Sequence, residues 1–247
     1  MSIQRLHVPD ALTEGADLHL MPEQAHYLAN VIRLPVGGSV LVFNGREGEW
    51  LAHRAEGGKR DVRLTVERQT RPQTPPGRVD YAFAPLKHAR LDYMVQKAVE
   101  MGARRLSPVL TRFTQVNRLN LERMTANAVE AAEQCGILSL PQVDAPLPLA
   151  DWLAALAEDR LLVFCDEGAP VADPVAALAG APAGDPVVLV GPEGGFSPDE
   201  RALLRAHPRC LVLSIGPRIL RADTAAVAAL ALVQAVRGDL GPHGASR

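Results

Sequence analysis

The chain has 247 residues, of which 47% are hydrophobic and 22% charged, and its formal net charge is -2. This length accommodates one large domain or two of ordinary size, and the composition excludes an intrinsically disordered chain. The N-terminus has no apolar run behind a basic stretch, and the longest apolar run, residues 225–236, is too short to span a bilayer. We therefore expect a cytoplasmic protein without membrane association.

Basic charge is concentrated in the middle of the chain. Residues 86–123 contain eight Lys and Arg against three Asp and Glu, whereas residues 124–247 contain eight against fifteen. A local excess of this kind is what a phosphate-binding surface requires, although a solvated helix face explains it equally well. The cysteines, Cys135, Cys165 and Cys210, are too widely spaced for a zinc site or a disulfide framework. We expect three buried small hydrophobic residues and no metal.

The first seventy residues are rich in predicted strands. Residues 3–8, 40–43, 49–55 and 62–66 predict short strands, and residues 22–34 predict a helix with Ala25, Leu28, Val31 and Ile32 on one side. Asn44-Gly45 predicts a tight hairpin turn, because both central positions of such a turn favour positive φ. Several short strands with tight turns predict a small barrel over residues 1–70. The polar, proline-rich residues 71–78 predict a linker.

Strands and helices alternate in residues 79–247. The predicted strands are 79–84, 105–110, 161–165, 187–190 and 210–214, and the clearest predicted helices are 89–101, 121–135 and 223–237. Short apolar strands are typical of parallel strands buried on both faces, so the pattern predicts a layered α/β sheet. The last helix is apolar on nearly all sides, which predicts a subunit interface and therefore a homodimer.

Two of these strands end in glycine-bearing loops. The first is VVLVGPEGGFSPDE, residues 187–200, where a capping box at Ser197 and Glu200 opens the next helix. The second is LVLSIGPRILRADTAA, residues 211–226. Open α/β sheets bind ligands at the carboxyl ends of their strands, and glycine lets backbone approach a ligand closely. Each motif has an alternative structural interpretation. The first would be only a tight strand-to-helix turn, and Arg218 and Arg221 of the second would only form salt bridges.

Taken together, GPEGGFS and IGPRILRADTA closely resemble the signature of the ribosomal small-subunit RNA uridine N3-methyltransferases, in the SPOUT class. HYLANVIRLPVGGSVLVFNG is similar to that family's PUA-like domain, and APLKHARLDYMVQKAVEMGARRLSPVL to the start of its catalytic domain. The resemblance implies a PUA-like RNA-binding β-barrel at 1–70 and a trefoil-knotted α/β domain at 79–247. It further implies a homodimer that binds S-adenosylmethionine. The sequence departs from the family's usual pattern in three places. Asp223 stands where the family usually has glutamate, and Ile137 where it commonly has arginine. The pair Arg112-Phe113 stands where the family has Glu-Arg.

The resemblance also assigns site residues. The methyl donor is expected to be bound by the backbone around Leu189, Gly191, Gly195, Ile215, Gly216 and Leu220. Those expected to bind RNA are Arg5, Arg33, Lys87, Arg90 and Lys97. Uridine N3 is mostly protonated at neutral pH, so the site must accept a proton and stabilise the anion that develops on the base. Glu193 or Asp223 would accept the proton, and Arg221 or Arg5 would stabilise the anion.

The expected substrate is small-subunit ribosomal RNA, naked or in the assembled subunit. One alternative keeps the SPOUT fold and changes the substrate to transfer RNA. Another is a ribosome-assembly factor that binds RNA without catalysis. A nucleotide hydrolase is a weaker alternative, because the sequence has neither a lysine-bearing phosphate loop nor a set of metal-binding carboxylates.

Overall fold

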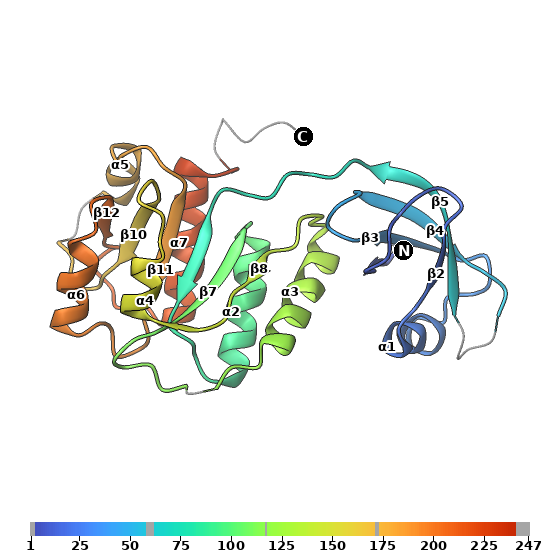
Figure 1. Cartoon of the computed structure of the whole chain (residues 1–247), viewed down its shortest axis with the longest axis horizontal. Helices are drawn as coiled ribbons and strands as arrows, with labels where there is room; N and C mark the ends of the chain where they lie inside the picture. Colours follow the sequence, from blue (N-terminus) through green and yellow to red (C-terminus); the bar gives the residue numbers. More distant parts are fainter. Residues whose placement is uncertain (1–2, 58–61, 117, 171–172, 241–247) are drawn as a thin grey trace. The chain divides into compact units, whose positions relative to one another are not determined.

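Figure 1 shows the computed structural model, which describes residues 3–57, 62–116, 118–170 and 173–240. The chain divides into two compact units. The N-terminal unit contains Met1–Pro75 and Ala132–Leu140, and the C-terminal unit contains Pro76–Ala131 and Pro141–Arg247. The sequence pattern did not predict that residues 132–140 belong to the N-terminal unit. Within the described ranges, no helix has both the length and the apolar character needed to cross a membrane.

The N-terminal unit is built on a five-stranded sheet in the order β1-β3-β4-β5-β2. Its strands are β1 (Arg5–His7), β2 (Asp17–His19), β3 (Ser39–Phe43), β4 (Glu49–Arg54) and β5 (Arg63–Arg71). Alternate residues such as Val40, Val42 and Leu64 are fully buried and form the core with Leu28. Because β1 and β2 each pair on one side only, the described strands form an open sheet.

The predicted helix of this unit changes its winding. The α-helix α1 (Pro22–His26) continues as a π-helical turn at Tyr27–Val31. The wider turn displaces the later side chains from the helical stripe. Ala25 and Leu28 are buried as predicted, but Val31 is 59% exposed, so its placement on the buried side was wrong.

The hairpin between β3 and β4 is confirmed: the two strands pair antiparallel, and β3 ends at Phe43 and β4 begins at Glu49, as predicted. The expectation of positive φ at both Asn44 and Gly45 was wrong, because Asn44 does not have it. The Asn44 side chain instead accepts hydrogen bonds from the N–H groups of Arg46 and Glu47. Positive φ occurs at Gly45 and Gly48, both at +81°. Asn44 therefore organises this loop through its side chain.

Residues 132–140 are fastened to the strands of the N-terminal unit. Arg5 donates from Nε to Glu49 Oε2 at 2.7 Å and from Nη1 to the Glu133 carbonyl at 3.0 Å. Arg71 donates to the Gly136 carbonyl at 3.1 Å. The expectation that Cys135 is buried was wrong: Cys135 is exposed, because α3 (Leu121–Cys135) ends there and the chain turns at Gly136.

The C-terminal unit has a parallel sheet in the order β12-β10-β11-β6-β7-β8. Its strands are β6 (Asp80–Phe83), β7 (Arg105–Leu110), β8 (Gln142–Val143), β10 (Leu161–Cys165), β11 (Pro186–Val190) and β12 (Cys210–Leu213), and β9 (Leu147–Pro148) also pairs with β7. Every residue of β6, β10 and β11 is buried, which confirms the prediction of parallel strands covered on both faces for these three. The same prediction was wrong for β12, which ends the sheet order and is only partly buried except at Leu213. β11 lies between β6 and β10, so chain order and sheet order differ. The trefoil knot remains a prediction.

Helices cover both faces of this sheet (Figure 1). α4 (Leu149–Ala154) and α6 (Pro198–Arg205) pack over Phe164 and Leu189. α2 (His88–Glu100) and α5 (Pro174–Ala179) each contact α7 (Ala222–Arg237), and α7 packs on β11. This packing buries Ala226, Leu230 and Val233. The chain itself therefore covers much of the helix that the sequence pattern assigned to a subunit interface.

Candidate functional site

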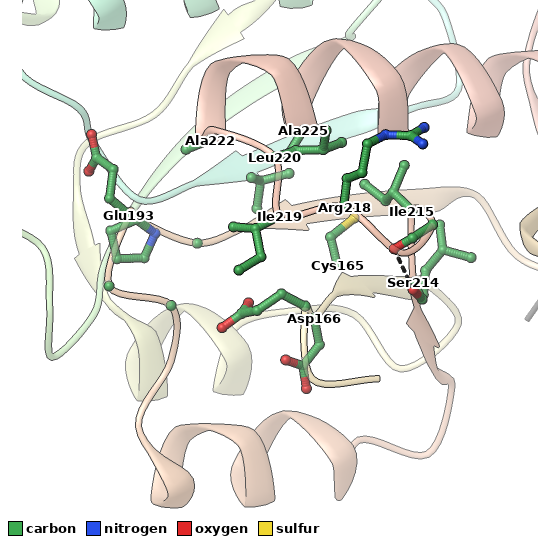
Figure 2. A pocket seen from close by; sticks show the side chains of 18 of the residues that line it. Cys165, Asp166, Glu193, Ser214, Ile215, Arg218, Ile219, Leu220, Ala222 and Ala225 are labelled. Atoms are coloured by element: carbon green, nitrogen blue, oxygen red, sulfur yellow. Dashed lines mark hydrogen bonds between the residues drawn. The ribbon is translucent and has the colours of Figure 1, made fainter. Parts of the chain in front are cut away.

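The carboxyl ends of β10, β11 and β12 meet at one pocket of about 330 Å³ (Figure 2). These strands are neighbours in the parallel sheet, so the loops that follow them emerge at the same edge. The pocket is lined by residues 165–167, 190–195 and 213–220, and by Ala222 and Ala225 of α7. Its volume lies in the range of small-molecule sites.

Glycines in two of these loops are required by backbone conformation and by packing. A Cβ atom on Gly191 would lie 2.5 Å from the Phe196 ring, which packs edge-on against Phe164 at a centroid distance of 5.0 Å. Gly195 has a φ of +66°, and a Cβ there would lie 2.5 Å from Glu167 Oε1. Gly216 has a φ of +99°. Side chains at these positions would strain or displace the pocket walls.

The loop after β11 leads directly into a capped helix. The Ser197 hydroxyl accepts a hydrogen bond from the Glu200 N–H at 3.3 Å, and the Ser197 N–H donates to Glu200 Oε2 at 2.8 Å. Pro198 occupies the first turn of α6. This capping box was predicted from the sequence, and it fixes where the glycine loop ends.

The loop after β10 supplies buried carboxylate charge. Asp166 is 2% exposed and faces two guanidinium groups of α6, Arg201 at 3.2 Å and Arg205 at 3.0 Å. Glu167 accepts from Arg201 at 2.6 Å. Burial raises the pKa of the neighbouring Cys165 to about 12, so this thiol is neutral at physiological pH and is not a nucleophile.

Sequence reasoning missed this third loop. The strand at 161–165 was predicted, but Cys165, Asp166 and Glu167 were not connected with the ligand site. The signal was present: an apolar strand that ends in Asp-Glu-Gly delivers its acidic residues to the same sheet edge as the glycine loops.

Arg90 of α2 joins two of the predicted catalytic carboxylates. Its Nη1 lies 2.5 Å from Glu193 Oε1, and its Nε lies 3.1 Å from Asp223 Oδ2. The hydrogen bonds from Arg90 lower the pKa of Asp223. Arg90 was assigned to RNA phosphates, whereas here it is engaged with acidic groups. Glu193 lines the pocket, and Asp223 follows Ala222 of the pocket wall.

Most residues predicted to bind the methyl donor lie around the pocket. The five that line it are Gly191, Gly195, Ile215, Gly216 and Leu220. Leu189 does not line it: its side chain is buried in the core beneath α4 and α6, and the next strand residue, Val190, lines the pocket instead. This difference follows from the alternation of side chains along a strand.

Of the two arginines in the motif at residues 211–226, only Arg218 lines the pocket. Arg218 lines the pocket, and in the view of Figure 2 it lies on the opposite side from Glu193, with Ile219 and Leu220 between them. Arg221 is exposed, immediately precedes α7 and is not among the lining residues. A role for Arg221 on the substrate remains a prediction.

The residues assigned to RNA have different surroundings. Arg33 and Lys87 are exposed. Lys97 pairs with Glu100 at 2.7 Å and lies over the Tyr93 ring. Arg5 is used by the internal contacts described above. The geometry therefore leaves Arg33 and Lys87 the most accessible cations of this set.

The chemistry of the pocket fits a nucleoside that carries a positive charge. Val190, Leu213 and Leu220 offer apolar surface for a flat ring. The carboxylates of Glu167 and Glu193 are about half exposed, and they can accept hydrogen bonds from hydroxyls and attract a cation. S-adenosylmethionine has each of these features, so the residues present fit this donor.

The N-terminal sheet unit and the parallel α/β unit each match a family model, and the two models together define the class as an RNA methyltransferase with a PUA domain. The family model described as "RNA methyltransferase domain" matches residues 73–234, and the one described as "RNA methyltransferase PUA domain" matches residues 22–67. The ribosomal RNA small subunit methyltransferase E of Synechocystis is 32% identical, with 96% of this chain and 78% of that protein covered. That of Rickettsia conorii is 29% identical, with 95% and 96% covered. The chain belongs to the ribosomal RNA small subunit methyltransferase E family.

Solved structures share the fold over nearly the full length. A methyltransferase of Legionella pneumophila, solved with bound S-adenosylmethionine, is 27% identical with a TM-score of 0.84, and 96% of this chain and 99% of that chain are covered. The ribosomal RNA small subunit methyltransferase E of Neisseria gonorrhoeae has a TM-score of 0.85 at 24% identity with the same coverage. The expected fold class, an α/β methyltransferase domain with a PUA-like domain, is confirmed.

Proposed function

We propose that this protein transfers the methyl group of S-adenosylmethionine to N3 of a specific uridine in small-subunit ribosomal RNA, in the cytoplasm. The observation that carries the proposal is the pocket formed by three strand-end loops, in a chain whose family and relatives are ribosomal RNA methyltransferases. The choice of uridine N3 comes from the resemblance of GPEGGFS and IGPRILRADTA to enzymes of that specificity.

The donor would occupy the pocket at the strand ends. When bound, S-adenosylmethionine supplies a methyl group made electrophilic by its sulfonium. Gly191, Gly195 and Gly216 keep the surrounding backbone close, and Ile215 and Leu220 provide apolar walls. The contribution of these residues is to hold the donor so that its methyl group faces the acceptor nitrogen.

Acceptance of the N3 proton falls to a carboxylate near the pocket. Glu193 is better placed than Asp223, because Glu193 lines the pocket whereas Asp223 does not and its pKa is lowered by Arg90. A lower pKa makes a carboxylate a weaker base. Arg90 holds both carboxylates in place, and Arg221 is assigned to the negative charge that develops on the uracil carbonyls.

The test is direct methylation. Small subunits from a strain that lacks this gene would be incubated with the purified protein and S-adenosylmethionine, and the ribosomal RNA would then be mapped by mass spectrometry. We expect one new methyl group, on N3 of a single uridine, and a strongly reduced yield with Glu193→Gln. Methylation of ribose, of another base or of transfer RNA alone would refute the proposal.

A further inference from the structure

One phenylalanine is placed differently from the others. Four of the five, Phe43, Phe83, Phe164 and Phe196, are at most 4% exposed, whereas Phe113 is 44% exposed. Exposure alone does not mark a binding site, because single apolar side chains are common on protein surfaces; the place of Phe113 beside the pocket gives its exposure meaning. Phe113 also belongs to the Arg112-Phe113 pair, one of the three places at which the sequence departs from the pattern of the family it resembles.

The turn that carries Phe113 is held firmly in place. It follows β7, and the Thr111 N–H donates to the Thr114 hydroxyl at 2.9 Å. The Arg112 N–H donates to Glu200 Oε1 at 2.7 Å. Glu200 is the residue whose other oxygen caps α6 through Ser197, so the turn is attached to the same helix start at which the glycine loop ends.

Phe113 packs beside the rim of the pocket. A Cβ atom on Gly194 would lie 3.0 Å from the Phe113 Cβ and 3.3 Å from its Cγ, so the aromatic side chain lies directly against the glycine backbone. Gly194 itself lines the pocket. Phe113 therefore lies against a residue of the pocket wall, and the neighbouring Arg112 side chain is exposed as well.

We propose that Phe113 is a stacking surface for an unpaired base of the RNA substrate beside the methyl-donor pocket, with Arg112 available to the adjoining phosphate. This inference rests on the proposed function. N3 lies on the pairing edge of uracil, so a uridine must leave its helix before N3 can react, and base faces are then exposed to water. Aromatic side chains cover such faces in proteins that recognise unpaired RNA, and an adjacent arginine adds phosphate contact.

A single ring with a neighbouring cation suits a base better than a protein partner. Stable protein interfaces bury hundreds of square ångströms on each side. Within the described residues, the immediate neighbours of Phe113 in sequence are polar or charged: Arg112, Thr114 and Gln115. Stacking needs only one flat face, and because every base has such a face it tolerates different sequences.

The test separates stacking from packing with three variants. Phe113→Ala removes the ring, Phe113→Tyr keeps an aromatic face, and Phe113→Leu keeps apolar volume without one. For each full-length variant, the Kd for small-subunit RNA would be measured with S-adenosylhomocysteine present, together with KM and kcat for methylation and the Kd for S-adenosylmethionine. We expect Phe113→Ala and Phe113→Leu to weaken RNA binding and raise KM about 10-fold or more, with near-normal donor affinity, and Phe113→Tyr to restore both values.

Two results would overturn the inference. Full RNA affinity in Phe113→Leu would show that apolar packing suffices, and a loss of donor affinity in Phe113→Ala that accounts for the whole effect would show that the ring only supports Gly194. RNA binding is measured without methyl transfer, so its outcome does not depend on which atom is methylated. Failure of uridine N3 methylation with an intact effect of Phe113 on RNA affinity would refute the proposed function alone.

Discussion

Arg90 is the residue through which the pocket loop and the start of α7 are coupled. Its guanidinium binds Glu193 on the loop and Asp223 on the helix. We predict that Arg90→Ala lowers kcat strongly, because both carboxylates lose their fixed position, and that Arg90→Lys, a point charge without the guanidinium fork, restores little of it. Single-turnover methylation at saturating donor measures this effect. Normal turnover in Arg90→Ala would show that the bridge has no part in the reaction.

The same bridge predicts a pH-dependent contribution to stability. Arg90 lowers the pKa of Asp223 in the folded protein, so the bridge stabilises the fold at neutral pH and loses its effect as the pH falls below about 4. The groups are partly exposed, so we expect a difference of only about 1 kcal/mol between wild type and Arg90→Ala at pH 7. Urea unfolding at pH 7 and in acid should show this difference shrinking as the pH is lowered.

Gly195 offers a test of the glycine loop. Its φ of +66° and the closeness of Glu167 make any side chain unfavourable. We predict that Gly195→Val weakens donor binding at least 10-fold while the protein still folds, since left-handed backbone costs a branched residue about 1–2 kcal/mol. Gly37→Val is the matched control: φ is +76°, nothing lies within 4 Å, and Gly37 belongs to the N-terminal unit. Equal donor affinity in both variants would exclude this loop from the donor site.

Arg221 and Arg218 can be distinguished by kinetics. If Arg221 stabilises the developing anion, Arg221→Ala should reduce kcat by about 10²–10³ and leave the Kd for the donor nearly unchanged. Arg218 lines the pocket, so Arg218→Ala should act mainly on donor affinity. Isothermal titration with S-adenosylmethionine and single-turnover rates would be compared. The opposite pattern would transfer the charge-stabilising role to Arg218.

Single residues show both the reach and the limit of sequence reasoning. Gly191 and Gly216 were assigned to the pocket from a strand followed by glycine, a local pattern that the fold preserves. The carboxylate partners of Arg90 could not be predicted, because they are more than 100 positions away along the chain. A basic side chain on a helix has the same appearance in a sequence whether it faces phosphate or a distant carboxylate.

At the scale of elements, hydrophobic periodicity predicted well where helices and strands occur, and it did not predict the order of the strands in the sheet. The strand at 161–165 and the helix at 121–135 have the bounds that were predicted. The π-helical turn at Tyr27–Val31 escaped prediction because it keeps the apolar composition of a helix. The insertion of β11 between β6 and β10 depends on contacts between strands far apart in the chain, which no local pattern specifies.

Helix α7 carries the proposal of a homodimer. Val233 is fully buried within the chain, so a charged residue at this position would disrupt folding and would not report on a dimer interface. Val227, Ala228, Ala231 and Leu232 are only partly covered and form the available apolar face. We predict that Leu232→Glu converts a dimer into a monomer, because an unpaired charge would be buried at the interface.

Light scattering on the wild type and on two variants tests this proposal. Ala235→Glu is the control, since Ala235 lies on the same helix and is already exposed. The wild type and the control should have twice the chain mass of 26.5 kDa, and Leu232→Glu should have the chain mass itself. A wild-type mass of 26.5 kDa would rule out the dimer.

At the scale of the whole molecule, one short segment of the later chain belongs to the N-terminal unit. Residues 132–140 are contributed to the N-terminal unit by the chain that otherwise builds the C-terminal unit. Hydrogen bonds from Arg5, Arg71 and Gln73 hold this segment. A cut in the proline-rich residues 71–78 would therefore deprive both fragments of native contacts, which the composition of that stretch did not indicate.

The last prediction concerns a fragment that covers residues 79–247. All residues that line the pocket lie between 165 and 225, so the fragment should bind S-adenosylmethionine with near-normal affinity. Residues 132–140 would lose their partners, but they lie outside the pocket, and their loss should lower the thermal midpoint more than the donor affinity. Without the exposed Arg33 of the N-terminal unit the fragment should methylate RNA poorly, and its RNA affinity should depend less on salt, by about one unit of slope per lost phosphate contact. Donor Kd, RNA Kd at two salt concentrations and single-turnover rates would be measured on the fragment and on the full chain.

Equal methylation rates would show that the N-terminal unit does not position the RNA. Loss of donor binding in a folded fragment would show that the pocket depends on the N-terminal unit.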